Sequence, residues 1–199
     1  AVVKKPVALS GGVVGGKTDS LTIGSAAHLL LSKVNLSGVV TLEVLHELKC
    51  DLVGSGVLSA EAGEKVNAAS IVSFFQSDLG RAVFEKDNEV LREWAFSLAV
   101  SAGKWQKGVI ALPNSDELDD IIVVQGIIDM VIKTQNGLIV IDFKTDRITA
   151  EQVAERGQLY RNQLDFYSLA AGAILKSKVN SKWLYFLEPA CSYELKQVK

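Results

Sequence analysis

Two carboxylates and a lysine interrupt the apolar run QGIIDMVIKTQNGLIVIDFKTD, at Asp129, Asp142 and Lys144. Aspartate is disfavoured inside strands, so its presence in two such apolar segments asks for a reason. Carboxylate oxygens suit Mg²⁺, and a bound metal lowers the pKa of its water and neutralises charge building on a phosphoryl group. A lysine beside them can orient the attacking water and stabilise the transition state. The trio suits metal-assisted phosphodiester hydrolysis; the alternative is a solvent-facing strand surface with a weak ion pair.

The turn of a predicted hairpin decides whether these three side chains converge. Asn136-Gly137 between two apolar runs is a strong signal for a two-residue turn. With that turn, Asp129 faces Lys144 across the ladder, and Asp142 lies two residues before Lys144 on the same strand. Directly opposed residues and residues two apart share one face of a sheet. The sequence therefore predicts that the three side chains emerge on one side, within roughly 5–8 Å of one another.

Capping residues and hydrophobic periodicity divide the chain into a helical N-terminal section and a later part rich in strands. The expected helices cover 25–34, Thr41 to about Leu52, short segments after Ser59, Asn67 and Ser77, and a long helix from the Thr149 capping box to about Lys176. The expected strands are Leu91–Val100, the two hairpin arms and Trp183–Leu187. This order predicts an α/β fold, with a mixed sheet flanked by helices behind a helical N-terminal section.

Length and composition are those of an ordinary globular protein. The chain has 199 residues, 48% hydrophobic and 22% charged residues, and a formal net charge of −2, enough for one domain with a substantial core. We expect a single domain over 21–199 after a glycine-rich flexible arm at 1–20; a signal peptide is the alternative for the arm, which its glycines disfavour. No apolar run approaches the roughly 18 residues that cross a bilayer. The chain does not begin with Met, and we expect a fragment of a longer protein.

A short glycine-rich motif and two cysteines bear on cofactors. The stretch GGVVGGKT at 11–18 satisfies the bare spacing of a P-loop. We expect a coincidence, because no strand is predicted before it and no apolar-periodic helix directly after it.

Cys50 and Cys191 are too few for a four-cysteine zinc or iron–sulfur site, so no iron–sulfur cluster is expected. Without a disulfide framework, a reducing cytoplasm is the expected compartment.

Four sequence segments together resemble the PD-(D/E)XK nucleases. Asp129 followed by DFK fits their bipartite D…(D/E)-x-K pattern, and QGIID resembles their G-x-(I/V)-D segment. DFKTD resembles the D-(Y/F)-K-T-D stretch of RecB-type nucleases, QLDFY at 163–167 resembles their Q-x-x-x-Y helix motif, and GSAAH at 24–28 resembles their G-T-x-x-H, with Ser in place of Thr. The resemblance covers roughly Leu21 to Leu187 and is nearest to the C-terminal nuclease domain of AddA-type helicase–nuclease proteins. Ala95 departs from their R-E-x-P-F strand, where proline is expected.

The resemblance implies a restriction-endonuclease-like fold and roles at matching positions. Asp129 and Asp142 would be metal ligands, with the backbone carbonyl of Phe143 as a third oxygen. Lys144 would be the catalytic lysine, and His28 a further ligand brought in from the N-terminal helix. Mg²⁺ is the expected cofactor, although imidazole suits Mn²⁺ somewhat better. On residue type alone, a lone histidine in an apolar helix is more often structural.

Two further motif positions and two acidic residues are assigned by the same resemblance or by local chemistry. Gln163 and Tyr167 lie four apart on one helix face, where we expect them to touch the active site or the scissile phosphate; the alternative is a packing stripe. Glu93 matches an acidic position of the family and is expected to support the metal site, unless it is a buried structural carboxylate. Asp146 is expected to cap the turn after the strand.

The function implied is that of a Mg²⁺-dependent DNA exonuclease within an ATP-dependent helicase–nuclease complex for double-strand break repair and recombination. The expected partners are DNA, the helicase domains of the same parent chain and an AddB-like subunit, with no membrane, in the cytoplasm at the nucleoid. The net charge of −2 fits a domain that receives its strand from a motor, because domains that grip nucleic acid unaided are usually basic. The alternatives are a catalytically silent nuclease-fold scaffold that binds DNA or a partner, and a free-standing nuclease.

Overall fold

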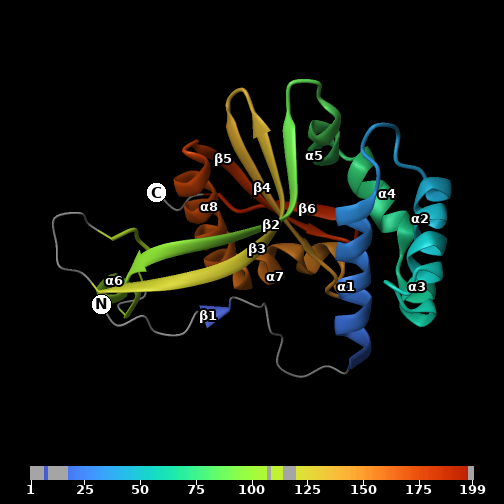
Figure 1. Ribbon diagram of the computed structural model, residues 1–199, viewed down its shortest axis with the longest axis horizontal. Helices are drawn as coiled ribbons and strands as arrows, with labels where there is room; N and C mark the ends of the chain where they lie inside the picture. The colour runs from blue at the N-terminus through green and yellow to red at the C-terminus, as the bar shows by residue number, and fades with distance from the viewer. Residues whose placement is uncertain (1–6, 9–17, 107–108, 114–119, 197–199) are drawn as a thin grey trace.

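The computed structural model describes residues 7–8, 18–106, 109–113 and 120–196, and strands in these ranges form one mixed sheet (Figure 1). β2 and β3 pair antiparallel, as do β3 with β4 and β5 with β6, whereas β4 with β5 and β1 with β3 are parallel. The predicted α/β class is therefore confirmed. The strands are β1 (Val7–Ala8), β2 (Glu89–Ser101), β3 (Ile121–Thr134), β4 (Gly137–Lys144), β5 (Val179–Phe186) and β6 (Cys191–Glu194).

Helices occupy the N-terminal section as predicted, and the four predicted caps are in place. The side chains of Thr41, Ser59, Asn67 and Ser77 each accept a hydrogen bond from a backbone N–H of the first turn, a contact worth about 1 kcal/mol. The helices are α1 (Thr18–Lys33), α2 (Leu42–Gly54), α3 (Ala60–Lys65), α4 (Ala68–Gln76), α5 (Asp78–Arg81), α6 (Ala102–Gln106), α7 (Val153–Leu159) and α8 (Arg161–Leu175), with short 3₁₀ helices η1 (Ala82–Phe84) and η2 (Ala150–Gln152). None of the helices in the described ranges is long and apolar enough to cross a membrane.

The first helix begins earlier than the sequence predicts. α1 starts at Thr18 rather than Ser25, and Val7–Ala8 pair with β3 as β1. The predicted absence of a strand before 11–18 and of a helix directly after it is therefore wrong, since β1 precedes this stretch and α1 begins at its last residue. Residues 11–17 themselves, and the arm apart from 7–8 and 18–20, lie outside the described residues.

The long helix predicted from Thr149 to Lys176 is interrupted. The capping box is present, with Gln152 Oε1 accepting from the Thr149 N–H at 2.9 Å, but α7 ends and α8 begins at Tyr160. Tyr160 leaves helical geometry at φ −93° and ψ 0°. Its hydroxyl is bonded to Asp146 outside the helix, and Gly157 before it is a weak helix former. Both features favour the break.

The hairpin register differs from the predicted one by two residues. Thr134 pairs with Gly137, so the turn residues are Gln135-Asn136 rather than Asn136-Gly137. The Thr134 side chain closes this turn, accepting from the Asn136 N–H at 3.1 Å and donating to the Gly137 carbonyl at 2.9 Å. Gly137 has φ +132°, and a Cβ there would lie 2.5 Å from the Lys178 carbonyl oxygen. A shift of two keeps the face of every side chain, so the predicted convergence survives although Asp129 does not face Lys144.

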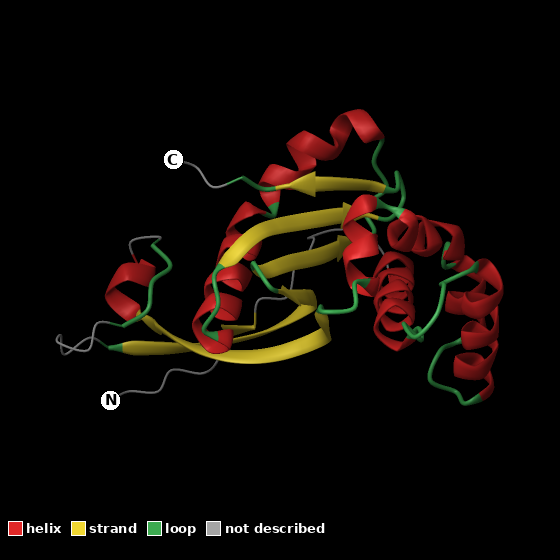
Figure 2. Ribbon diagram, turned by 90° about the horizontal axis from the view of Figure 1, so that it is seen from above, coloured by secondary structure: helices red, strands yellow, loops and turns green. Residues whose placement is uncertain are grey.

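Helices cover both faces of the sheet, and each face has its own apolar core. α1 to α5 pack over one face with Met130, Ile141 and Phe143, and α8 packs over the other with Val131 and Val140. Figures 1 and 2 show the α1–α4 group to one side of the strands, and the long β2–β3 ribbon projecting away from it with α6 at its end. A smaller core joins α7 to the β5–β6 edge.

Candidate active site

The predicted residues meet at a fork between two strands. β3 and β4 stay paired from the turn as far as Met130 and Ile141, and the next residues outward are Asp129 and Asp142. There Asp129 Oδ2 accepts a hydrogen bond from the Phe143 N–H at 2.7 Å. A side chain thus takes the place of the next backbone pair, and it fixes the carboxylate of β3 against β4.

The neighbouring strand adds a second carboxylate at the same level. β2 pairs with β3 at Arg92–Met130 and Trp94–Ile128, but Glu93 between them has φ +48°. Such a left-handed conformation costs a non-glycine residue about 1–3 kcal/mol and occurs preferentially at functional sites. In this chain the left-handed residue is Glu93 itself, at the position on β2 that lies opposite Asp129. The structure therefore favours Glu93 as part of the site over a merely buried structural carboxylate.

The first helix brings His28 to this pair of acids. Its Nδ1 lies 3.1 Å from Asp129 Oδ1 and 3.9 Å from Glu93 Oε1. Ligand atoms of these three residues all lie within 4.8 Å of one another. Burial alone would lower the pKa of His28, but its hydrogen bond to Asp129 and the nearby negative charges raise it overall. The imidazole is thus bonded to an acid, while its ring lies edge to face with the buried Phe143 ring, at a centroid distance of 6.5 Å.

Arg92 holds the helix that carries His28. Its guanidinium donates to the carbonyl oxygens of Leu31 at 3.1 Å and Val34 at 2.6 Å, at the C-terminal end of α1, where carbonyls lack helical partners. Because Arg92 precedes Glu93 on β2, one short segment fixes both the helix and the second carboxylate. The sequence prediction did not identify Arg92, although its place directly before Glu93 was an available signal.

Asp142 forms an ion pair with Lys144 rather than joining the tight group. Its side chain is almost fully buried, and its Oδ2 lies 2.7 Å from Lys144 Nζ. Burial and, to a lesser degree, the charge of Asp129 raise the pKa of Asp142 to about 6, against the opposing effects of Lys144 and His28. The two residues share one face of β4, as their spacing predicts.

The predicted helix pair lies behind the lysine. Gln163 Oε1 accepts from Lys144 Nζ at 3.0 Å, and Gln163 Nε2 donates to the Tyr167 hydroxyl at 2.9 Å. Tyr167 is buried, and that burial and the charges of Asp142 and Asp129 raise its pKa. Gln163 is thus in contact with the site, whereas Tyr167 reaches it through Gln163 and also packs in the core beneath α8.

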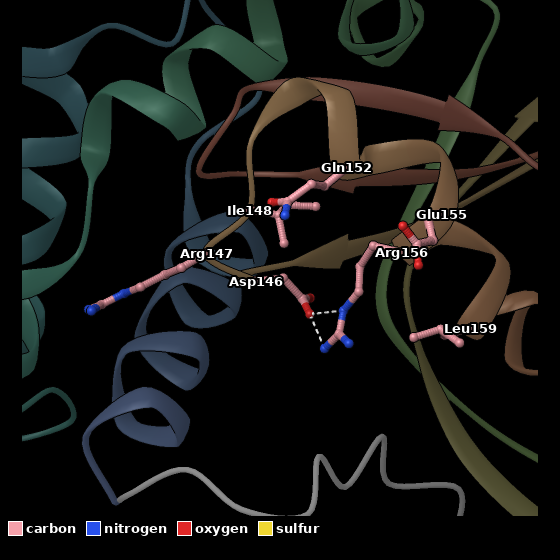
Figure 3. A pocket seen from close by; sticks show the side chains of 7 residues that line it. All are labelled: Asp146, Arg147, Ile148, Gln152, Glu155, Arg156 and Leu159. Atoms are coloured by element: carbon pink, nitrogen blue, oxygen red, sulfur yellow. Dashed lines mark hydrogen bonds and ion pairs between the residues drawn. The ribbon is translucent and has the colours of Figure 1, made fainter.

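A further network adjoins Lys144 and was not predicted. The expected cap by Asp146 is wrong: its carboxylate is held by Arg156, with an Nε–Oδ1 distance of 2.6 Å, and by the Tyr160 hydroxyl at 3.0 Å. The Tyr160 ring lies under Lys144, with Nζ 4.2 Å from the ring centroid. Figure 3 shows the Asp146–Arg156 pair at the edge of a pocket of about 420 Å³. That pocket is lined by Asp146, Arg147, Ile148, Gln152, Glu155, Arg156 and Leu159.

The donor set fits a divalent cation. Burial and the charge of Asp129 raise the pKa of Glu93, as burial and that same charge do for Asp142. Carboxylates crowded in this way repel one another, and a bound cation relieves the repulsion. Oxygen ligands with one imidazole suit Mg²⁺ or Mn²⁺ rather than a soft metal. The Phe143 carbonyl stays a predicted ligand; the N–H of the same residue donates to Asp129 at the fork.

Comparison with known families identifies the class of protein. A family model described as the PD-(D/E)XK nuclease superfamily matches residues 11–196. The chain belongs to this superfamily, and the predicted resemblance is confirmed.

Within the superfamily, the chain is similar to one portion of much longer proteins named as helicase/nuclease subunits. The chain is 35% identical over 172 residues to an ATP-dependent helicase/nuclease subunit from Ligilactobacillus salivarius (strain UCC118), which is 86% of this chain and 13% of that protein. It is 37% identical over 172 residues to the protein of the same name from Moorella thermoacetica, again 86% of this chain and 12% of the relative. For Thermoanaerobacter sp. (strain X514) the identity is 34% over 187 residues, 92% of this chain and 14% of the relative. The chain thus spans about an eighth of the length of these relatives.

Proposed function

We propose that this chain is a divalent-metal-dependent deoxyribonuclease domain that hydrolyses phosphodiester bonds. The observation that carries the proposal is the convergence of Asp129, Glu93 and His28 at the strand fork, beside the Asp142–Lys144 ion pair. Acids and an amine drawn together against an apolar wall are costly to bury without a cation or substrate.

Each residue has a role that follows from its contacts. Asp129, Glu93, His28 and Asp142 would hold the cation, which when bound activates water and neutralises charge on the phosphate. Lys144 provides a positive charge and N–H donors close to the acids, suited to a phosphate oxygen or to the attacking water. These are the roles implied by the family motif.

The wider setting is part of the same proposal. The relatives are named as ATP-dependent helicase/nuclease subunits, and we propose that 21–199 is the nuclease domain of such a machine. It would act as an exonuclease in double-strand break repair and recombination, in the cytoplasm at the nucleoid. ATP use would belong to helicase domains of the same parent chain, working with an AddB-like partner protein, and Mg²⁺ would be the physiological metal.

A cleavage assay tests the proposal. The purified chain is incubated with linear single- and double-stranded DNA and with covalently closed circular DNA, in Mg²⁺, Mn²⁺ or chelator. We expect metal-dependent cutting of the linear substrates. Asp142→Ala and Lys144→Ala should each abolish it, whereas Lys133→Ala, which removes an exposed ion pair with Glu89, should cut like the parent.

The alternatives give different results in that assay. DNA binding without metal-dependent cutting would favour the silent scaffold. Cutting that survives in Asp142→Ala and Lys144→Ala would disprove the site. Equal cutting of circular and linear DNA would contradict the exonuclease assignment, and cutting stimulated by a helicase partner would favour the machine over a free-standing enzyme.

A further inference from the structure

The ammonium of Lys144 is bounded on three sides by groups that attract a cation. Asp142 Oδ2 lies 2.7 Å away, Gln163 Oε1 3.0 Å away, and the centroid of the Tyr160 ring 4.2 Å away. A lysine side chain is flexible and loses rotamer entropy when it is fixed. Lys144 is fixed nonetheless, with its side chain only 12% exposed. The first two partners lie on the predicted motifs, but the third does not.

The Tyr160 ring is placed by a break in the helix and by a clamp on its hydroxyl. Tyr160 stands between α7 and α8 with non-helical backbone angles. Its hydroxyl lies 3.0 Å from both Asp146 carboxylate oxygens, and Arg156 grips the same carboxylate through Nε at 2.6 Å and Nη2 at 2.5 Å (Figure 3). Asp146 is two residues after Lys144 on the chain. The clamp therefore ties the ring to the end of the strand that carries the lysine.

The Tyr160 ring is also supported from the sheet. It packs in the small core beneath α7, with its centroid 6.4 Å from that of Phe186 on β5. A ring held at its hydroxyl and packed against a buried strand keeps its position without Lys144. It can therefore act as a fixed surface for the ammonium, because the electron-rich face of an aromatic ring attracts a cation.

We propose that Tyr160 is a positioning residue of the nuclease site, whose ring, fixed by packing against Phe186 and further by Asp146, holds the ammonium of Lys144 in its working orientation. The inference rests on the proposed function for the role of Lys144, but the contact itself does not. Burial and the charge of Asp146 raise the pKa of Tyr160 to about 12, so its hydroxyl stays a donor to Asp146 at neutral pH.

Two substitutions separate the ring from the hydroxyl. Tyr160→Phe keeps the ring and removes the hydroxyl with its two contacts to Asp146. Tyr160→Leu removes the ring and the hydroxyl but still fills the apolar core. We expect kcat for linear DNA to fall about tenfold in Tyr160→Leu, as expected for losing a well-placed cation–π contact. KM for DNA should hardly change. Tyr160→Phe should recover most of the rate.

A matched control distinguishes positioning from packing. Tyr193 belongs to the same small core and accepts a hydrogen bond from Gln158 of α7 at 2.7 Å, with no contact to Lys144 among the described interactions of the two side chains. Tyr193→Leu should therefore leave kcat unchanged. Thermal unfolding of all three variants measures any loss of fold. A drop in kcat in Tyr193→Leu equal to that in Tyr160→Leu would overturn the proposal.

A second readout does not depend on activity. The ε-methylene protons of Lys144 lie near the Tyr160 ring face, so their NMR signal should be shifted upfield by the ring current. It should stay shifted in Tyr160→Phe and return to the ordinary lysine range in Tyr160→Leu. The proposal fails if the signal does not move in Tyr160→Leu, if it moves with no loss of kcat, or if Tyr160→Phe loses as much kcat as Tyr160→Leu. A parent chain that cuts no DNA would contradict the proposed function. It would leave the contact between Lys144 and Tyr160 untouched, because the NMR signal of Lys144 tests that contact without any cleavage.

Discussion

Asp142 bears a negative charge at a place that water scarcely reaches, and this has a consequence for stability. Its pKa is raised to about 6 from an ordinary value of 3.8, so between these pH values the folded chain binds a proton that the unfolded chain has released. Stability from this group is therefore complete below about pH 4 and is lost as pH rises through about 6. His28 and Glu93 also have raised pKa values, so their contributions to folding stability are likewise lost as pH rises.

Asp142→Asn isolates that contribution. Since the amide carries no charge, in chelator at pH 8 the variant should be more stable than the parent by roughly 2–3 kcal/mol. The difference should vanish towards pH 4. Urea unfolding of both proteins at a series of pH values measures it, and added Mn²⁺ should stabilise the parent more than the variant. A parent that is the more stable of the two at pH 8 would contradict the account.

Among single residues, the motif positions were the most predictable. The residues that hold the motif side chains in place, such as Tyr160 and Arg92, were the least predictable. Residue type and motif spacing were enough to predict four site positions, and the structure brings them together: Asp129, Asp142, Lys144 and Gln163. Tyr160 is an ordinary apolar position by sequence, because the local signal for a break, a single glycine at Gly157, is weak. The contact with Asp146 that accompanies this break joins residues 14 apart in the chain.

At the scale of elements, the contact between α1 and β2 decides where His28 lies. Arg92→Ala removes the two bonds to the C-terminal carbonyls of α1 and should lower the free energy of unfolding by about 2–3 kcal/mol, since partly buried carbonyls lose a charged donor. The affinity for Mn²⁺ should fall about tenfold, the size expected for losing a support of a metal ligand. Chemical unfolding and Mn²⁺ titration by electron paramagnetic resonance measure the two effects.

Arg81→Ala is the control for that substitution. Within the part of the chain that the structure describes, the Arg81 side chain forms an exposed ion pair with Asp78, so its loss should change neither quantity. The explanation through His28 also requires that Arg92→Ala have little further effect on Mn²⁺ affinity in a His28→Ala background. An equal loss in both backgrounds would show that Arg92 does not act through His28.

Element types were predictable from the sequence where the local signal is strong. Polar caps predicted the starts of α2, α3, α4 and α5, and Asn136-Gly137 between two apolar runs predicted the hairpin. The turn was wrong by one residue, and the register therefore by two, because Gly137 serves a close approach to the Lys178 carbonyl, a contact between distant segments. The short strands β1 and β6 were missed for the same reason, since each depends on a neighbouring strand and not on its own sequence.

At the scale of the whole molecule, net charge limits how the chain meets DNA. With a formal charge of −2 it should bind DNA no more tightly than ordinary non-specific complexes, with Kd weaker than about 10 μM at physiological salt. Fluorescence anisotropy of the non-cleaving Lys144→Ala variant with single-stranded DNA measures this. Mg²⁺ should strengthen binding, because it offsets the repulsion between the acids and the phosphates. Nanomolar binding without metal would show that the chain captures DNA unaided.

The central claim is that the strand fork holds a divalent cation, and a Mn²⁺-soaked crystal tests it most directly. The account predicts an anomalous difference peak in contact with Asp129 and at least one of Glu93, His28 and Asp142, which disappears in Asp129→Asn. A fully soaked crystal with no peak at the fork, or with peaks only on surface carboxylates, would contradict it.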